Sequence, residues 1–250
     1  MEPAFYARYA ELEETHWWFA GRRAIVAKAV AYAAPRTGRP LRILEVGCGT
    51  GGMLSLLQPF GKTVGVDVSH LALRLAQRHD GPELVRADFC SLPFADGTFD
   101  LVGVFDTLEH VADDVAALRE LGRVCRPGGR LIVSVPAFPF LWGRQDVVSR
   151  HYRRYVRAEL LSRVGAAGFA PAYVTYFNTW LFPAVAAIRV ARRLIRVSAD
   201  PTESDFDTVP SPLCNRWLGR VLASEAAVIG RFALPVGVSL LSVSTRSAAS

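Results

Sequence analysis

The chain has 250 residues, a formal net charge of +6 and 51% hydrophobic residues. A chain of this length can bury a single hydrophobic core, and its hydrophobic content argues against intrinsic disorder. Arginines carry nearly all of the positive charge and are scattered, without the basic and aromatic stripe that is typical of nucleic-acid-binding proteins. We therefore expect one globular domain with no nucleic-acid partner.

Cysteine use and the N-terminal composition indicate the compartment. No CxxC pair and no histidine-rich spacing is present, which argues for a reducing compartment and against a structural zinc site. The N-terminal residues lack the apolar stretch of a signal peptide. We expect a cytoplasmic protein.

Residues 1–40 are predicted to form an N-terminal helical segment. Apolar spacing predicts two helices between residues 3 and 34, around a break at Gly21. His16, Trp17 and Trp18 lie close to this break. The segment can pack on the domain as an ordinary helix, or fold over a ligand site as a lid whose aromatic side chains exclude water.

The next segment organises the rest of the chain. Residues 41–46 form a short apolar run that predicts a buried strand, glycines follow at 47, 49, 51 and 52, and a helix begins at Met53. A strand, a glycine turn and a helix in this order are typical of the ligand-binding turn of an open α/β sheet, because glycine lets the backbone approach a ligand closely.

Four more apolar runs, separated by helical patterns, predict a parallel sheet built from βαβ units. These runs are residues 62–67, 84–87, 101–105 and 130–136. Because ligands bind at the carboxyl ends of such strands, Asp67, Asp88 and residues 105–110 should meet in one cleft. Asp67 also lies 20 positions after Gly47, the spacing at which a strand-end carboxylate reaches the hydroxyls of a ribose.

These motifs resemble those of class I S-adenosylmethionine-dependent methyltransferases, of the small-molecule type with a domain like methyltransferase domains 11 and 12. Glu45 to Gly51, EVGCGTG, resembles the family's acid-x-Gly-x-Gly-x-Gly signature. Asp67 matches the acid that binds the ribose, and Asp88-Phe89 the position that meets the adenine. The pattern continues through residues 92–100, 108–111 and 126–129.

The resemblance implies an α/β fold: a Rossmann-like, seven-stranded, mostly parallel sheet with helices on both faces. Residues 41–177 would form the core that binds S-adenosylmethionine, the implied cofactor. The cofactor-binding residues that it implies, together with their neighbours along the same edge, are Glu45, Gly47, Cys48, Gly49, Gly51, Asp67, Val68, Asp88, Phe89 and Phe105.

The last two predicted strands are residues 172–177 and 238–244, and the family fold places the seventh antiparallel beside the fifth. Residues 178–236 are then an insertion, followed by the last strand and tail at 237–250. The insertion contains apolar helical stretches at 180–197 and 213–232. The first is too short for a membrane span. A substrate cap or a homodimer surface ranks above a basic amphipathic helix that makes peripheral membrane contact.

The implied activity moves a methyl group to an O, N or C atom of a small-molecule or lipid-linked acceptor. We expect this reaction to belong to biosynthesis, and more narrowly to secondary metabolism. The in-line displacement needs no metal, because alignment and water exclusion can provide most of the catalysis. His151 and His110 are the catalytic candidates; the first can instead belong to a surface loop, the second to the structure or the cofactor side. The proposed substrate-binding residues are Trp18, Phe138, Trp142, Arg144 and Tyr152.

Two alternatives remain open. Gly47, Gly49 and Gly52 also fit the dinucleotide fingerprint, so the chain could be an NAD(P)-dependent oxidoreductase in which Asp67 holds the ribose. Glu45 and Asp88 favour the methyl donor over this alternative. A non-catalytic protein that keeps the cofactor-binding fold is the second alternative.

Overall fold

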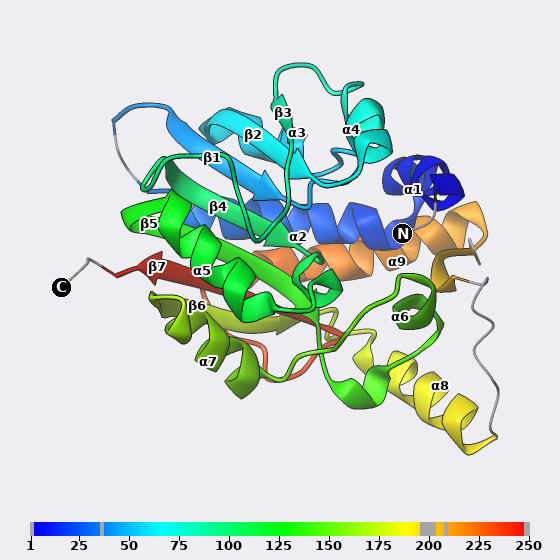
Figure 1. The fold of residues 1–250 in the computed structure, drawn as a ribbon. Helices are drawn as coiled ribbons and strands as arrows, with labels where there is room; N and C mark the ends of the chain where they lie inside the picture. The colour runs from blue at the N-terminus through cyan, green and yellow to red at the C-terminus, as the bar shows by residue number, and fades with distance from the viewer. Residues whose placement is uncertain (1–2, 36–37, 196–203, 208–209, 248–250) are drawn as a thin grey trace.

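The apolar runs of the sequence form one mixed sheet in the computed structural model, which describes residues 3–35, 38–195, 204–207 and 210–247. Within this part the sheet has seven strands in the order β3-β2-β1-β4-β5-β7-β6 (Figure 1). The strands are β1 (Leu41–Val46), β2 (Gly61–Asp67), β3 (Glu83–Arg86), β4 (Phe99–Phe105), β5 (Cys125–Pro136), β6 (Phe169–Phe177) and β7 (Ser239–Arg246).

The strand directions confirm the expected α/β fold. Strands β1 to β5 pair in parallel, whereas β7 runs antiparallel to both β5 and β6. Strand β6 begins at Phe169, three residues before the predicted start. Residues 126–129 turn within β5, where the pairing moves from Phe99 opposite Cys125 to Leu101 opposite Arg130.

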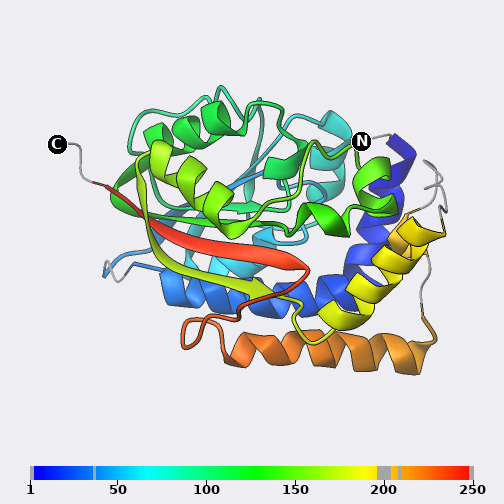
Figure 2. The same cartoon turned by 90° about the horizontal axis from the view of Figure 1, so that it is seen from below.

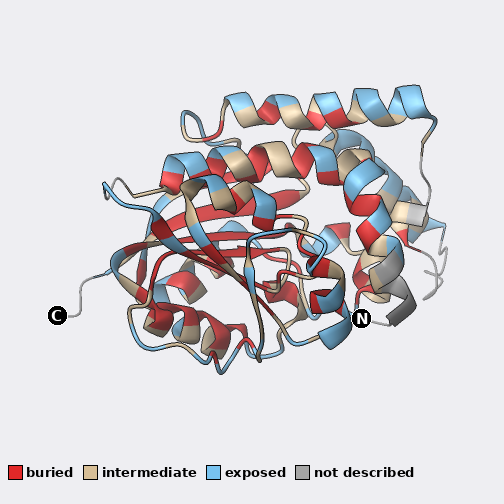
Figure 3. Cartoon of the chain, turned by 90° about the horizontal axis from the view of Figure 1, so that it is seen from above, coloured by how far each residue is buried: buried red, intermediate tan, exposed pale blue. Residues whose placement is uncertain are grey.

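Helices cover both faces of the sheet, as the resemblance implies. Helices α5 and α7 lie on one face and α2 on the other, and α9 forms a further layer outside α2 (Figure 2). The buried residues concentrate in the sheet and on the helix faces turned toward it (Figure 3). The helices are α1 (Pro3–Thr15), α2 (Trp17–Ala33), α3 (Leu54–Leu57), α4 (His70–Ala76), α5 (Asp114–Val124), α6 (Arg144–Val148), α7 (Arg157–Ala166), α8 (Phe182–Leu194) and α9 (Pro212–Ser224).

The two N-terminal helices meet at His16, so the predicted break at Gly21 is wrong. His16 caps α2 by accepting a hydrogen bond from the backbone N–H of Trp18 at 3.2 Å. Gly21 lies inside α2, where an added Cβ would lie 2.5 Å from the side chain of Leu222 in α9. The glycine therefore permits close helix packing, a role that its tendency to break helices concealed in the sequence.

A short turn follows β4. Residues Leu108–His110 form a 3-10 turn, and α5 starts only at Asp114. Asp113 caps α5 by accepting from the backbone N–H of Ala116 at 2.9 Å. The interruption separates Glu109 and His110 from the helix and leaves them facing the interior.

The insertion contains two helices that are shorter than predicted. Helix α8 ends at Leu194. Residues 196–203, which include the end of the predicted stretch and the start of the segment that links it to the second stretch, lie outside the described residues. None of the residues of α8, all of which the structure describes, is buried. Helix α9 packs on α2 and adds Leu222 to the core. The dimer and membrane roles of the insertion stay predictions.

Within the part of the chain that the structure describes, no helix combines the length and the apolar character needed to cross a membrane.

A buried carboxylate joins the starting ends of three strands. Asp100 is 1% exposed and accepts hydrogen bonds from the Arg39 guanidinium at 2.9 and 2.8 Å and from the Arg42 backbone at 2.8 Å. Arg126 forms an ion pair with the same carboxylate. Burial alone would raise the pKa of Asp100, but these hydrogen bonds and the charge of Arg126 hold it below its usual value.

We expect Asp100→Asn to lower the free energy of unfolding at pH 7 by about 1–3 kcal/mol, because the two arginines and the Arg42 amide lose a buried, charged acceptor. The folded pKa lies below the unfolded one, so the stabilisation is present above pH ~4 and is lost as the pH falls through the folded pKa. Urea unfolding at pH 7 and pH 3 measures this. A deficit equally large at both pH values would contradict the assignment.

Candidate active site

A cavity of about 750 Å³ lies at the carboxyl ends of the parallel strands. Its walls come from α1, the start of α2, the glycine turn after β1, the ends of β2 and β4, and the segment that follows α6. Val185 and Arg189 of α8 complete one side. This is the place where ligands bind in open α/β sheets.

The glycine turn forms the floor at one end of the cavity. Gly47 and Gly49 have φ values of +72° and +55°, a left-handed backbone that glycine adopts without strain. The side chain of Asp67, at the end of β2, accepts hydrogen bonds from the backbone N–H groups of Gly49 and Ser69 at 2.9 and 2.8 Å. The carboxylate thus fixes the turn and still borders the cavity.

Two acidic side chains lie beneath and beside this turn. Glu45 in β1 is 2% exposed, and its Oε2 has no hydrogen-bond partner among the described residues. Burial raises the pKa of Glu45 well above its usual value. Glu13 of α1 accepts a hydrogen bond from the hydroxyl of Thr50 and lies 3.6 Å from Arg78. Helix α1 is therefore attached directly to the glycine turn.

Arg22 connects α2 to the end of β4. Its guanidinium pairs with Asp106 at 2.7 Å and donates to the carbonyl oxygen of Phe105 at 2.8 Å. The same guanidinium lies 5.0 Å from the centre of the Trp18 ring. Because Arg22 and Trp18 both line the cavity, the start of α2 forms a fixed wall.

A pair of histidines forms the opposite wall. The rings of His110 and His151 meet edge to face with centroids 4.5 Å apart. Burial, with the neighbouring charge of His151, lowers the pKa of His110 to about 3, so this imidazole is neutral at physiological pH. The Nδ1 atom of His151 lies 2.9 Å from Oδ1 of Asp146.

Asp146 holds the segment that carries His151. This fully buried carboxylate accepts from Nε of Arg154 at 2.9 Å and from the backbone N–H of Gly143 at 2.8 Å. Burial would raise the pKa of Asp146, but the hydrogen bond from His151 and the charge of Arg154 lower it overall. Arg154 also donates to the carbonyl of Ala137 at 3.1 Å, which ties the segment to the end of β5.

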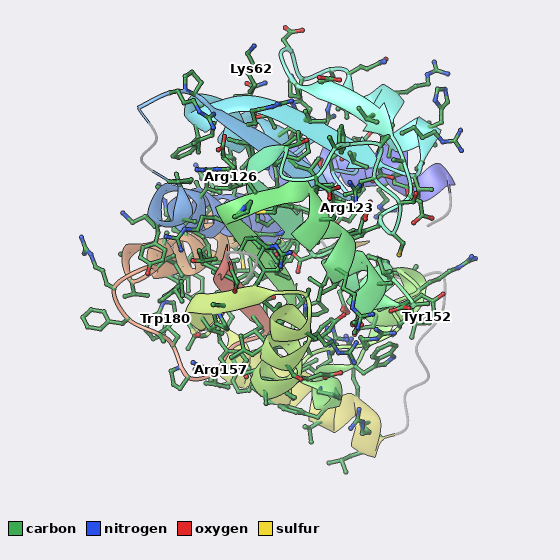
Figure 4. All side chains as sticks on the ribbon, turned by 60° about the vertical axis from the view of Figure 1, so that its left-hand side comes forward. Lys62, Arg123, Arg126, Tyr152, Arg157 and Trp180 are labelled. Carbon is green, nitrogen blue, oxygen red and sulfur yellow. The ribbon has the colours of Figure 1, made fainter. Side chains whose placement is uncertain are left out.

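Most residues that the sequence singled out lie around this cavity. Two of the predicted substrate-binding residues, Trp18 and Tyr152, are among them. Tyr152, which Figure 4 labels, is the more exposed of the two, at 60%. The predicted residues that line the cavity are Trp18, Glu45, Gly47, Cys48, Gly49, Asp67, Val68, Asp88, Phe89, Phe105, His110, His151 and Tyr152.

Four predicted residues do not line it. Gly51 faces Ala76 and His79, because an added Cβ would lie 3.2 Å and 2.7 Å from their side chains. Phe138 stacks on Tyr176 with ring centroids 5.0 Å apart and packs against the core. Trp142 and Arg144 also lie outside the cavity lining. Their segment follows β5 as expected.

Several cavity residues were missed in the sequence. Tyr9, Glu13 and Arg22 come from the N-terminal helices, whose lid interpretation was the signal that could have found them. Glu109 also lines the cavity and was not singled out as a site residue. Asn178, directly after β6, lines the cavity with a φ of +58°, and no local pattern marks it.

Comparisons with known proteins agree with this geometry. Residues 44–133 match a family described as a methyltransferase domain. A demethylmenaquinone methyltransferase of Corynebacterium kroppenstedtii is 39% identical over 109 residues, which cover 42% of this chain and 46% of that protein. A probable S-adenosylmethionine-dependent methyltransferase of Mycobacterium tuberculosis is 32% identical over 164 residues, covering 64% of this chain and 58% of its own length.

The chain thus spans about half the length of the curated relatives it matches. A complex of the Haloferax volcanii Trm112 methyltransferase activator with a methyltransferase contains a chain of the same fold, with a TM-score of 0.63, 19% identity, and coverage of 99% of this chain and 96% of that one. At this identity the likeness shows the fold alone. The matched domain, the glycine turn and the sheet order together support a class I S-adenosylmethionine-dependent methyltransferase, a class whose cofactor is S-adenosylmethionine.

Proposed function

We propose that this chain transfers the methyl group of S-adenosylmethionine to a small or lipid-linked acceptor within the cavity. The observation that carries the proposal is that one continuous cavity joins the glycine turn and Asp67 to a separate wall containing His110 and His151. A methyltransferase needs both ends, one for the donor and one for the acceptor. The family match favours this donor over the nicotinamide cofactor that the glycine spacing also allowed.

The glycine end fits S-adenosylmethionine. An added Cβ at Gly49 would meet nothing within 4 Å, so the backbone there is open to a ligand. Each carboxylate oxygen of Asp67 accepts one backbone hydrogen bond and keeps lone pairs for ribose hydroxyls. The buried, unpartnered Oε2 of Glu45 suits the positive charge of the donor. The proposed cofactor-binding residues are Glu45, Gly47, Cys48, Gly49, Asp67, Val68, Asp88, Phe89 and Phe105.

The acceptor end combines aromatic and polar side chains. Trp18 and Phe206 lie with ring centroids 5.2 Å apart and line the same cavity as the histidine pair and Tyr152. This lining suits an acceptor with an apolar ring or chain and one polar group at the reacting atom. The relative from Corynebacterium kroppenstedtii is named for demethylmenaquinone, which supports an acceptor of quinone type.

The bound cofactor supplies an electrophilic methyl group on a sulfonium centre. The chain's own contribution is to hold the acceptor in line with that methyl and to keep water away. Helix α1 covers the cavity through Tyr6, Tyr9 and Glu13, and its attachment to the glycine turn makes this cover part of the site. His110 and His151 are the polar groups that we place beside the acceptor.

Incubating the protein with S-adenosylmethionine labelled in the methyl group, against a panel that includes demethylated quinones, tests the activity. Transfer of label to an acceptor would support the proposal. Binding of S-adenosylhomocysteine without transfer to any acceptor would favour a non-catalytic cofactor-binding protein. A preference for a reduced nicotinamide in thermal-shift measurements would overturn the choice of cofactor.

Asp67→Ala should weaken binding of S-adenosylhomocysteine by roughly 10- to 100-fold, because the ribose hydroxyls and the Gly49 amide both lose their acceptor. Calorimetric titration measures this. Asp96→Ala, which removes a carboxylate that is 81% exposed and remote from the cavity, is the matched control. Equal affinities of the two variants would remove Asp67 from the site.

His151→Ala should reduce kcat by roughly 10- to 100-fold, because acceptor placement is lost at the reacting end. The affinity for S-adenosylhomocysteine should stay close to that of the parent chain, since His151 lies on the opposite wall from Asp67. Steady-state kinetics with the best acceptor, together with calorimetry, separate the two effects. Unchanged turnover would return His151 to a structural role.

A further inference from the structure

Three side chains on the acceptor-side wall converge in the way that metal ligands do. Glu109 and His110 come from the 3-10 turn after β4, and His151 from the segment after α6. One ligand atom from each residue lies within 4.8 Å of the other two. All three residues line the cavity, so a bound ion would be reachable from it.

The two histidines are oriented by contacts behind them. His151 Nδ1 lies 2.9 Å from the Asp146 carboxylate. The His110 ring lies close to the backbone of Ser149. Because Nδ1 of His151 faces Asp146, its Nε2 can bind another partner. Metal-binding histidines show this arrangement, in which a carboxylate or a backbone carbonyl fixes the ring and raises its basicity.

Glu109 provides a buried carboxylate oxygen that accepts no hydrogen bond from the residues that the structure describes. Its side chain is 1% exposed, and its Oε2 has no hydrogen-bond partner among the described residues. The nearby arginines are engaged elsewhere, Arg22 with Asp106 and Arg154 with Asp146. A buried carboxylate oxygen without a partner is costly, and a cation at this point would satisfy it.

We propose that Glu109, His110 and His151 bind a divalent transition-metal ion such as zinc. Two imidazoles and one carboxylate suit zinc or iron, whereas magnesium and calcium prefer oxygen ligands alone. Coordination bonds of about 2.0–2.2 Å bring ligand atoms within about 3.5 Å of one another, so the side chains must close by about 1 Å on binding.

This site goes beyond the proposed function, because methyl transfer itself needs no metal. Three protein ligands leave at least one coordination position open, as in catalytic rather than structural sites. The open position would face the cavity, where an oxygen atom of the acceptor could occupy it. The ion would then orient the acceptor opposite the glycine turn.

The test uses the full chain, without a histidine tag and after treatment with a chelator. Calorimetric titration with Zn²⁺ should show one ion bound per chain. Glu109→Gln, which preserves shape, and His151→Ala should each weaken this binding by about 10- to 100-fold. His70→Ala, which removes an exposed histidine at the start of α4, should leave it unchanged.

Absence of Zn²⁺ binding in the parent chain would overturn the proposal, as would equal affinities of the parent and the two cavity variants. Binding of S-adenosylhomocysteine shows that each variant is folded. If a variant fails to fold, the absorption spectrum of the parent chain with Co²⁺ decides: bands of nitrogen and oxygen ligation support the site, and a thiolate charge-transfer band would place the ion at a cysteine such as Cys90 instead.

The outcome is separable from that of the proposed function. If the parent chain transfers methyl groups but does not bind zinc, this inference alone is overturned. Zinc binding without methyl transfer to any acceptor would overturn the proposed activity and leave the metal site in place.

Discussion

The shape of the cavity depends on the buried ion pair between Arg22 and Asp106. Arg22 belongs to an N-terminal helix, whereas Asp106 follows the central strand and holds a left-handed backbone with a φ of +51°. Arg22 is only 5% exposed, and so deeply buried a charge is tolerated when a partner of opposite charge compensates it. Neither side chain can therefore be moved without the other. The pair fixes the start of α2 against the end of β4, and with it the turn that presents Glu109 and His110.

The sheet and the end of the cavity formed by the glycine turn were predictable because their signals are local. Each strand is an apolar run with a turn beside it, and the spacing of the glycines and Asp67 depends on one βαβ unit. The wall that contains the histidine pair was only partly predictable, because its contacts join segments that no sequence period relates. His151 was expected near the cleft, but its meeting with His110 depends on Asp146. Phe138 was expected in the cleft and instead stacks on Tyr176.

Asp146 explains why the acceptor side could not be derived from composition. Its carboxylate lies in the middle of an aromatic and basic segment, and it collects a histidine, an arginine and a backbone amide. These contacts hold His151 and Arg154 at the cavity. Sequence reasoning ranked the bulky and charged residues Trp142 and Arg144 as lining residues. The buried acid drew no attention because a single aspartate carries no pattern.

The packing of α9 on α2 gives the insertion between β6 and β7 a role in the stability of the whole molecule. Leu222 fills the space left by Gly21, and the side chain of Asn215 bonds to the backbone of Thr15 and Trp17 where α1 meets α2. The N-terminal cover of the cavity is therefore held from behind by residues two hundred positions away. A chain that lacked the insertion between β6 and β7 would expose the apolar back of α2 to water, and its cavity would lose the support of one wall.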